Sequence, residues 1–437
     1  MTFKPTFKLR SSVLSVLAGV ALACSGARAQ VAVLAENLYT MASRDPNNPG
    51  GLIKNGVVVI TDGKVVEVGP KDRVNIPPGH RLINAHTATP GLIDARATAG
   101  LTGILNSPHD SDQLEKSAPI QPELRAIDAY NPQERLVEYI RSFGITTIHT
   151  GHAPGELITG QTMVVKTAGL TVDEAVLTPI AAVAATLGPE AVRSGGSPGT
   201  RGKQVAMLRS ELVRAREYLT KREKFEADLA SFEKQFAAGT VAADKKPERP
   251  GRDLRMEMLA DVLAGKVPLM VYCQRAQDIA STLRLADEFK FKLWLEGAAE
   301  SYLLADQIKA AGVPVILHPS MQRSAGENEN QSFETAATLV KAGIPVSMQS
   351  GYEAYVPKVR VVLLEAAITA ANGLSFTQAL ATITTEPAKL LGLSDRIGSL
   401  EVGKDGDVAL YTGDPFEYTT HCSAVVINGK VVSETLR

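Results

Sequence analysis

The stretch Thr89-Pro-Gly-Leu-Ile-Asp-Ala-Arg-Ala-Thr-Ala-Gly100 decides the fold of this chain. A proline and a glycine form a turn signal, and the aliphatic residues after them lead directly to Asp94. This pattern predicts a turn that feeds a buried parallel strand with polar groups at its C-terminal end. The polar side chains that follow Asp94 are Arg96 and Thr98.

The chain that follows this stretch repeats the same pattern, in which short apolar runs alternate mostly with helical segments. Eight such runs in sequence favour an α/β chain folded as a (β/α)8 TIM barrel over residues 89–392. The expected strands are 92–94, 146–149, 163–166, 175–178, 269–273, 292–296, 314–317 and 345–348.

Both ends of the chain are rich in short β-branched runs separated by tight-turn signals. Asp62-Gly63 and Asn428-Gly429 each separate two such runs, as expected for hairpins. We therefore expect residues 30–88 and 393–437 to assemble one small β-sandwich domain beside the barrel.

An insertion at about 203–266 interrupts the strand-helix pattern. It is dense in Lys, Arg and Glu, and Leu208, Leu212, Ala215 and Leu219 recur in it at helical spacing. The spacing predicts a helix with one packed face. Two interpretations stay open, a solvated helical excursion and a lid or partner-binding arm over the barrel mouth.

The N-terminus has the pattern of an export signal. Three basic residues precede the apolar run Val13–Cys24, and Ala27-Arg-Ala29 follows. The pattern predicts a signal peptide over residues 1–29 and an exported, periplasmic protein. The run is too short to span a bilayer, and no later segment is apolar enough to do so. The alternative is a lipoprotein anchored at Cys24.

Charge and cysteine content narrow the classes of partner. The 46 basic and 47 acidic residues give a formal net charge of −1, so no global field favours nucleic acid or an anionic membrane. A small-molecule ligand or short peptide, a homo-oligomer or a paralogue partner is expected instead. After cleavage only Cys273 and Cys422 remain, and we expect buried thiols, although an oxidising compartment would allow them to pair.

Four blocks of sequence resemble the amidohydrolase superfamily, in its imidazolonepropionase-like branch, over nearly the whole mature chain. They are 56–69, Pro90-Gly-Leu-Ile-Asp94, 371–392 and Gly398-Ser-Leu-Glu-Val-Gly-Lys-Asp-Gly-Asp407. The resemblance implies a TIM barrel with a β-sandwich. It also implies a hydrolase of non-peptide C–N bonds or short peptides that uses one or two divalent metals.

In such enzymes the metal is held by His-x-His after the first strand and by further groups after strands four, five, six and eight. The metal lowers the pKa of a bound water and so generates hydroxide. Here the first pair reads Arg96 and Thr98, the fifth strand ends at Gln274, the sixth at Glu296 and the eighth at Gln349. A guanidinium cannot ligate a metal, because it only donates hydrogen bonds and stays protonated. We therefore expect no metal and no other cofactor, and impaired or silent hydrolysis.

A relocated zinc site is the alternative. His149 and His152 follow the second expected strand, and His318 follows the seventh, so all three belong at one face of the barrel. The competing interpretation is that these histidines form local hydrogen bonds.

Arg96 itself suggests a specific hypothesis. A buried arginine needs a counter-charge, and Glu296 on the sixth strand can provide one. Nearby, Gly160-Gln161 resembles a family loop beside the substrate, and Lys166 either contacts a substrate carboxylate or lies at the surface. The expected pocket comprises Arg96, Thr98, Gln161, Lys166, Gln274, Glu296, His318 and Gln349.

Two functions remain open from the sequence. One is an exported amidohydrolase-type hydrolase. The other is a catalytically silent family member that binds a ligand or acts as the partner subunit of an active paralogue.

Overall fold

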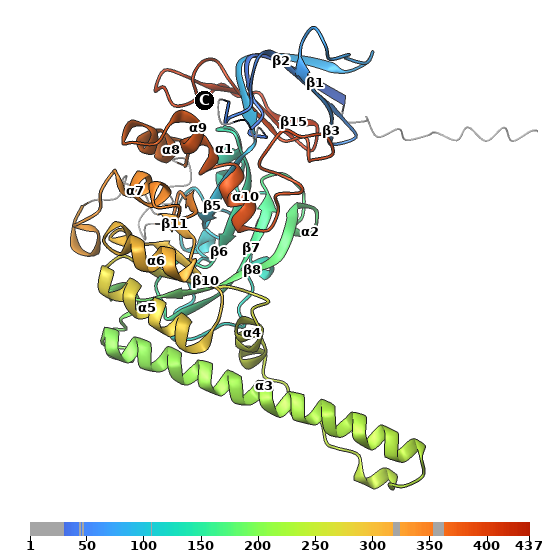
Figure 1. Cartoon of the computed structure of the whole chain (residues 1–437), viewed down its shortest axis with the longest axis vertical. Helices are drawn as coiled ribbons and strands as arrows, with labels where there is room; N and C mark the ends of the chain where they lie inside the picture. Colours follow the sequence, from blue (N-terminus) through green and yellow to red (C-terminus); the bar gives the residue numbers. More distant parts are fainter. Residues whose placement is uncertain (1–29, 43–44, 46–47, 106, 318–323, 353–361) are drawn as a thin grey trace, which may run out of the picture.

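The computed structural model describes residues 30–42, 45, 48–105, 107–317, 324–352 and 362–437. They form a β-sheet domain and a barrel that lie one above the other in Figure 1. The β-sheet domain contains strands from both ends of the chain, as the sequence predicts. Its seven strands lie in one sheet, in the order β15-β14-β13-β4-β1-β2-β3. Their bounds are β1 Gln30–Tyr39, β2 Leu52–Thr61, β3 Lys64–Pro70, β4 Arg81–Pro90, β13 Val408–Tyr411, β14 Cys422–Ile427 and β15 Lys430–Ser433.

The two predicted hairpins are present in this sheet. Asp62 and Gly63 join β2 to β3, and Asn428 and Gly429 join β14 to β15, all four with positive φ. Positive φ at both central residues suits the two-residue turns that match strand twist. Between these hairpins, β13 pairs with β4 and with β14, so the C-terminal strands complete a sheet begun by the N-terminal ones.

The barrel contains the eight predicted strands in one nearly closed sheet of order β12-β11-β10-β9-β8-β7-β6-β5. The backbone N–H of Gly351, just after β12, donates to the carbonyl oxygen of Arg96 on β5 at 3.1 Å and so bridges the two edges. The bounds are β5 Leu92–Ala97, β6 Ile145–Gly151, β7 Ile158–Lys166, β8 Val176–Thr186, β9 Leu269–Cys273, β10 Leu293–Gly297, β11 Val315–Leu317 and β12 Val346–Met348.

One strand differs from the expected parallel pattern. β7 runs antiparallel to both β6 and β8. The connection from β6 to β7 covers only residues 152–157, which is too short for the crossover that a parallel pair needs. The start of β7 therefore lies at the C-terminal ends of the other strands, and Lys166 lies at the opposite end of the barrel.

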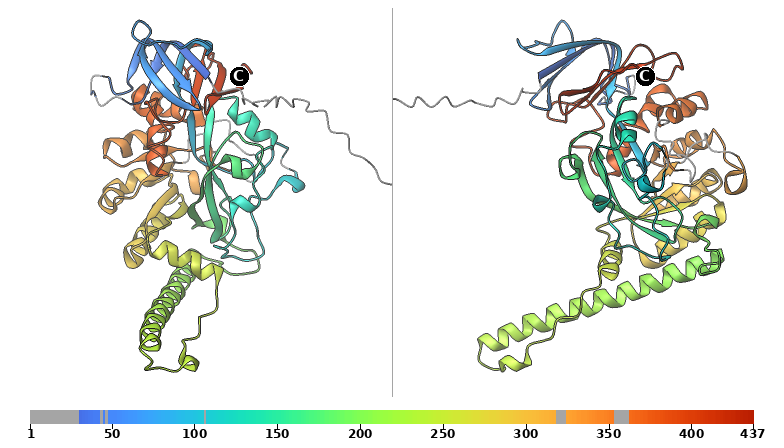
Figure 2. Two further views of the ribbon diagram at one scale, coloured as in Figure 1. Left: turned by 90° about the vertical axis from the view of Figure 1, so that its right-hand side faces the viewer. Right: turned by 180° about the vertical axis from the view of Figure 1, so that it is seen from behind.

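Helices pack around the barrel strands (Figure 2), and α10 contacts β5 and β12. Ala388 of α10 clusters with Ile93 and Val164 inside the barrel. Short caps fix several helix starts: Asp253 accepts from the backbone N–H groups of Arg255 and Met256 at the start of α4. The bounds are α1 Arg135–Arg141, α2 Val172–Ala175, α4 Leu254–Leu263, α5 Ala276–Phe289, α6 Ala305–Ala311, α7 Thr335–Lys341, α8 Val362–Ala371, α9 Phe376–Ala381 and α10 Thr385–Leu390.

The predicted insertion forms α3, which spans Arg201–Ala237 and projects beyond the barrel (Figures 1 and 2). Its buried side chains are Gln204, Leu208, Leu212 and Ala215, all in the half nearest the barrel. The packed face therefore begins as the sequence predicts and ends midway along the helix.

Two further expectations concern the cysteines and membrane-spanning helices. Cys273 and Cys422 are both free and buried, which confirms the prediction of buried thiols. Within the described part of the chain, no helix is both long enough and apolar enough to cross a membrane.

Candidate functional site

The C-terminal ends of the barrel strands bring a buried ion pair together. Arg96 at the end of β5 and Glu296 near the end of β10 are 2% and 3% exposed, and Arg96 Nε lies 3.3 Å from Glu296 Oε1. Arg96 Nη1 donates to the carbonyl oxygen of Ala97 at 2.8 Å, and Nη2 donates to that of His152. The Arg96–Glu296 pair predicted from the sequence is therefore present.

Few neighbouring groups compensate the charges of Arg96 and Glu296. Burial raises the pKa of the Glu296 carboxyl, and the positive charge of Arg96 counteracts that rise. Arg96 Nε has no well-directed hydrogen bond, so the pair is held mainly by charge and by the two carbonyl oxygens that accept from Arg96. Removing either partner would leave an uncompensated charge in the barrel interior.

Asp94 lies beside this pair and joins β5 to the segment after β12. Its carboxylate accepts from the backbone N–H groups of Ser350 at 3.0 Å and Arg96 at 3.2 Å, and from the Ser350 hydroxyl. Burial raises the pKa of Asp94 to about 7, and the bonds from Ser350 limit the rise. The sequence marked Asp94 only as part of a strand. A serine after the eighth expected strand was the signal for this contact.

His149 forms local hydrogen bonds through both ring nitrogens. Nδ1 lies 2.8 Å from the carbonyl oxygen of Ala95, which can only accept, so Nδ1 carries the proton. Nε2 then accepts from Thr162 Oγ1 at 2.6 Å. Burial, followed by the charge of Arg96, lowers the pKa of His149 to about 3. With both nitrogens engaged, this histidine has no lone pair left for a metal.

His152 is buried with a neutral ring. Its imidazole packs against Gly160, where a Cβ would lie 2.5 Å from His152 Cδ2, and neither ring nitrogen has a hydrogen-bond partner. Burial and the nearby Arg96 lower its pKa to about 4. His318, the third histidine of the alternative zinc site, lies outside the described residues.

The residues at the ends of β5 and β6 do not fit the metal that the resemblance implies. Arg96 fills the first ligand position with a cation, and Thr98 supplies one neutral, unpartnered hydroxyl at the second. In the described ranges no three His, Cys, Asp or Glu side chains are grouped to hold an ion. A hydrolytic site needs about three protein ligands, which these residues do not supply.

The predicted glutamines form internal hydrogen bonds. Gln274 Nε2 donates to Tyr272 Oη at 2.8 Å, and its Oε1 accepts from the Ala299 backbone at 2.9 Å. Gln349 Nε2 donates to the Ile316 carbonyl at 3.1 Å. These amides strengthen the contacts between strand ends.

Gln161 faces a different neighbour. Its Nε2 donates to the carbonyl oxygen of Pro122 at 2.9 Å, and its backbone N–H donates to that of Leu124 at 2.7 Å. Gln161 therefore holds the long connection between β5 and α1 against the start of β7.

Lys166 is placed differently from the sequence expectation of a substrate contact or a surface lysine. It is only 2% exposed, and its Nζ pairs with Asp407 and, at 3.1 Å, with Asp405 Oδ2. Asp405 also binds Lys64 Nζ at 2.6 Å and Arg396 Nη2 at 3.1 Å. Because β7 runs antiparallel, Lys166 lies at the N-terminal ends of the other barrel strands. There it joins the barrel to the β-sheet domain.

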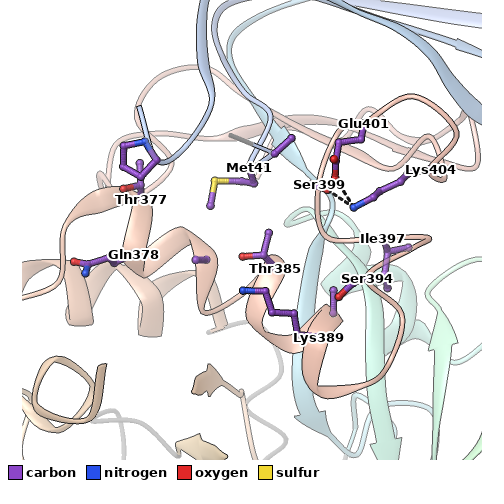
Figure 3. Close-up of a pocket in the computed structure, with 14 residues that line it drawn as sticks. Met41, Thr377, Gln378, Thr385, Lys389, Ser394, Ile397, Ser399, Glu401 and Lys404 are labelled. Carbon is purple, nitrogen blue, oxygen red and sulfur yellow. Dashed lines mark hydrogen bonds and ion pairs between the residues drawn. The ribbon is translucent and has the colours of Figure 1, made fainter. Parts of the chain in front are cut away.

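A separate groove of about 460 Å³ lies between the β-sheet domain and helices α9 and α10 (Figure 3). Lys404 Nζ on its wall donates to Ser399 Oγ at 2.6 Å and pairs with Glu401. Thr385 and Lys389 line the opposite side. None of the buried charges at the strand ends lines this groove, so we place the candidate site at the barrel mouth.

Comparison with known proteins agrees with this architecture. A family model described as the amidohydrolase family matches residues 297–433. An amidohydrolase structure from Thermotoga maritima MSB8 is 26% identical and superposes with a TM-score of 0.82, covering 93% of this chain and all of that one. The chain belongs to the amidohydrolase superfamily. Its membership of the imidazolonepropionase-like branch stays a prediction.

Other relatives of this amidohydrolase-superfamily protein differ in length or only share its fold. Amidohydrolase tasK of Hapsidospora irregularis is 26% identical over 393 residues, which cover 83% of this chain and 38% of tasK. The chain thus spans less than half the length of that curated relative. A prolidase structure complexed with N-methylphosphonate-L-proline, 15% identical with a TM-score of 0.53 over 93% of this chain and all of that one, shares the fold.

Proposed function

We propose that this amidohydrolase-superfamily protein does not perform metal-assisted hydrolysis of C–N bonds at its barrel mouth. It instead binds a small molecule or short peptide there, or acts as the partner subunit of an active paralogue. The single observation that carries this proposal is the buried Arg96–Glu296 ion pair.

The physical reason is the difference between a metal ion and a guanidinium. A catalytic metal keeps an open position where a water loses its proton. Arg96 stays protonated, its charge is compensated by Glu296, and it donates to the carbonyl oxygens of Ala97 and His152. A guanidinium in this arrangement cannot generate hydroxide.

Metal analysis of the purified protein, run alongside a hydrolysis screen on dipeptides and lactams, tests the proposal. We expect metal far below one equivalent and no turnover above that of an Arg96→Ala variant. A named active amidohydrolase assayed in parallel, such as a prolidase, confirms that the substrates and conditions are adequate. Stoichiometric zinc together with turnover would overturn the proposal.

Hydrolysis of a C–N bond in a cyclic amide or short peptide is the second candidate function. It is favoured by the similarity to proteins named as amidohydrolases. In this case the same screen would give turnover that a Glu296→Gln variant loses. Resistance of that turnover to a chelator would indicate a metal-free mechanism.

We also propose that the protein is exported to the periplasm after cleavage behind Ala29. The basic residues before the apolar run 13–24 and the small residues Ala27 and Ala29 support this proposal. An N-terminus at Gln30 in protein recovered from the periplasmic fraction is the expected result. A lipid-modified Cys24 at the N-terminus would support the lipoprotein alternative instead.

A further inference from the structure

Three side chains at the barrel mouth carry buried polar atoms that have no hydrogen-bond partner among the described residues. They belong to Thr98, His152 and Gln349, which are 1%, 5% and 0% exposed. The unpartnered atoms are Thr98 Oγ1, both ring nitrogens of His152 and Gln349 Oε1. Buried polar atoms are nearly always paired, so a group of unpaired ones points to a bound molecule or to ordered water.

These three side chains follow three neighbouring strands of the barrel. Thr98 comes directly after β5, His152 after β6 and Gln349 after β12. β5 pairs with β6, and the hydrogen bond from the Gly351 N–H to the Arg96 carbonyl oxygen joins β5 to the segment after β12. The Arg96 guanidinium also donates to the carbonyl oxygen of His152. The unpartnered atoms therefore belong to one arc of the barrel mouth.

The amide of Gln349 and the ring of His152 define which hydrogen bonds this arc lacks. Gln349 Nε2 donates to the carbonyl oxygen of Ile316, which can only accept, so the free atom of the amide is the acceptor Oε1. Burial and the charge of Arg96 lower the pKa of His152 to about 4, so its ring is neutral, with one donor and one acceptor nitrogen. A matching ligand therefore both donates and accepts hydrogen bonds.

The positive charge beside the arc is already compensated. Arg96 Nε lies 3.3 Å from Glu296 Oε1. Lys166, the other cation expected near a substrate, lies at the opposite end of the barrel and pairs with Asp407. A carboxylate bound in the arc could only accept hydrogen bonds, so it would leave Gln349 Oε1 unpaired. It would also add a second negative charge beside Glu296, without a cation to balance it.

We propose that the barrel mouth binds an uncharged molecule that both donates and accepts hydrogen bonds, and that it discriminates against ligands with a carboxylate. This inference rests on the proposed function, which places ligand binding at the mouth. It narrows the ligand class, because a free short peptide carries a carboxylate at its C-terminus and is excluded. A peptide with both ends blocked meets the requirement.

Two probes that differ in one group test this preference. N-acetylglycinamide is uncharged and has N–H donors, whereas N-acetylglycine carries a carboxylate in place of the terminal amide. In saturation-transfer NMR titrations of the purified protein at pH 7, N-acetylglycinamide should bind at least about ten-fold more tightly than N-acetylglycine. Equal affinities, tighter binding of N-acetylglycine, or no binding of either probe would overturn the inference.

Two variants distinguish a ligand contact from a structural one. Thr98→Val and His152→Phe remove unpartnered atoms and nearly keep the shape of the side chain. Each should weaken binding of N-acetylglycinamide at least about five-fold and leave the melting temperature of the ligand-free protein unchanged or higher, because no side-chain hydrogen bond is lost. His86→Phe is the matched control, since His86 is 42% exposed on β4 of the β-sheet domain, and it should bind both probes as the wild type does. A lower melting temperature with unchanged binding would overturn the inference.

The inference and the proposed function fail in different ways. Zinc-dependent hydrolysis of N-acetylglycinamide would overturn the proposed function and leave the preference for an uncharged ligand in place. Binding of N-acetylglycine as tight as that of N-acetylglycinamide, weakened by both Thr98→Val and His152→Phe, would overturn the preference and leave ligand binding at the mouth in place.

Discussion

Arg96 and Glu296 each depend on the other for charge compensation within the barrel. Replacing Arg96 by Met leaves the Glu296 carboxylate buried without a counter-charge, so we expect the free energy of unfolding to fall by about 3–5 kcal/mol. Denaturant unfolding measures this loss. Adding Glu296→Gln to Arg96→Met should recover part of it, because the double variant has no unpaired charge. A loss below about 1 kcal/mol in the single variant would show that the pair is not the main support of the barrel mouth.

Asp94 makes stability depend on pH. Its pKa rises from 3.8 in the unfolded chain to about 7 in the fold, so the native state binds its proton more tightly. Stability from this group is therefore complete below about pH 4 and is lost as pH rises through about 7, by up to roughly 4 kcal/mol.

An Asp94→Asn variant cannot ionise at this position. Its unfolding free energy, measured from pH 4 to pH 7, should fall less with pH than that of the wild type. Only the slope is compared, because the substitution also alters the hydrogen bonds from Ser350. Equal slopes in the two proteins would contradict a raised pKa at Asp94.

The backbone conformation at position 160 and the close contact with His152 both require a glycine there. Its φ is +136°, and an added Cβ would meet the His152 ring at 2.5 Å. We expect Gly160→Ala to lower the free energy of unfolding by about 2 kcal/mol or more. Gly202→Ala is the matched control, since Gly202 lies in α3 with open space around it and should gain up to about 1 kcal/mol. Thermal unfolding compares the two, and equal effects would refute the role of the close contact.

Among the elements, the barrel strands could be predicted because each is a short apolar run bounded by turn residues. The direction of β7 was missed, although the short 152–157 connection was a usable signal. The direction of β7 decides at which end of the barrel Lys166 lies. The sequence pattern around Lys166 does not reveal this location. Its partners Asp405 and Asp407 lie in a block that the sequence marked only as a family motif.

The same reasoning explains which parts of the site could be predicted. The Arg96–Glu296 pair followed from residue chemistry, because a buried guanidinium needs a carboxylate and strand order placed one nearby. The contacts of Asp94, Gln161 and His152 depend on where loops fold back. Loop paths depend on long-range packing that periodicity does not encode.

Lys166 connects the two structural units. Lys166→Met should lower the free energy of unfolding by about 3 kcal/mol or more, because Asp407 would lose its buried partner. Lys389→Met is the control, since Lys389 is exposed and its pair with Glu386 contributes little. Denaturant unfolding distinguishes the two. A loss at Lys166 as small as that at Lys389 would contradict a structural role for this contact.

At the scale of the whole molecule, the sheet built from both chain ends constrains the order of folding. β4 lies between β1 and β13, and the hydrogen bond from Lys64 to Asp405 joins positions 341 apart in sequence. Such long-range pairing slows folding, because a large loop must close first. β1, β2, β3 and β4 pair with one another without the C-terminal strands, but β4 keeps a free edge until β13 pairs with it. Before β13 is in place, that edge can template pairing with a strand of another chain.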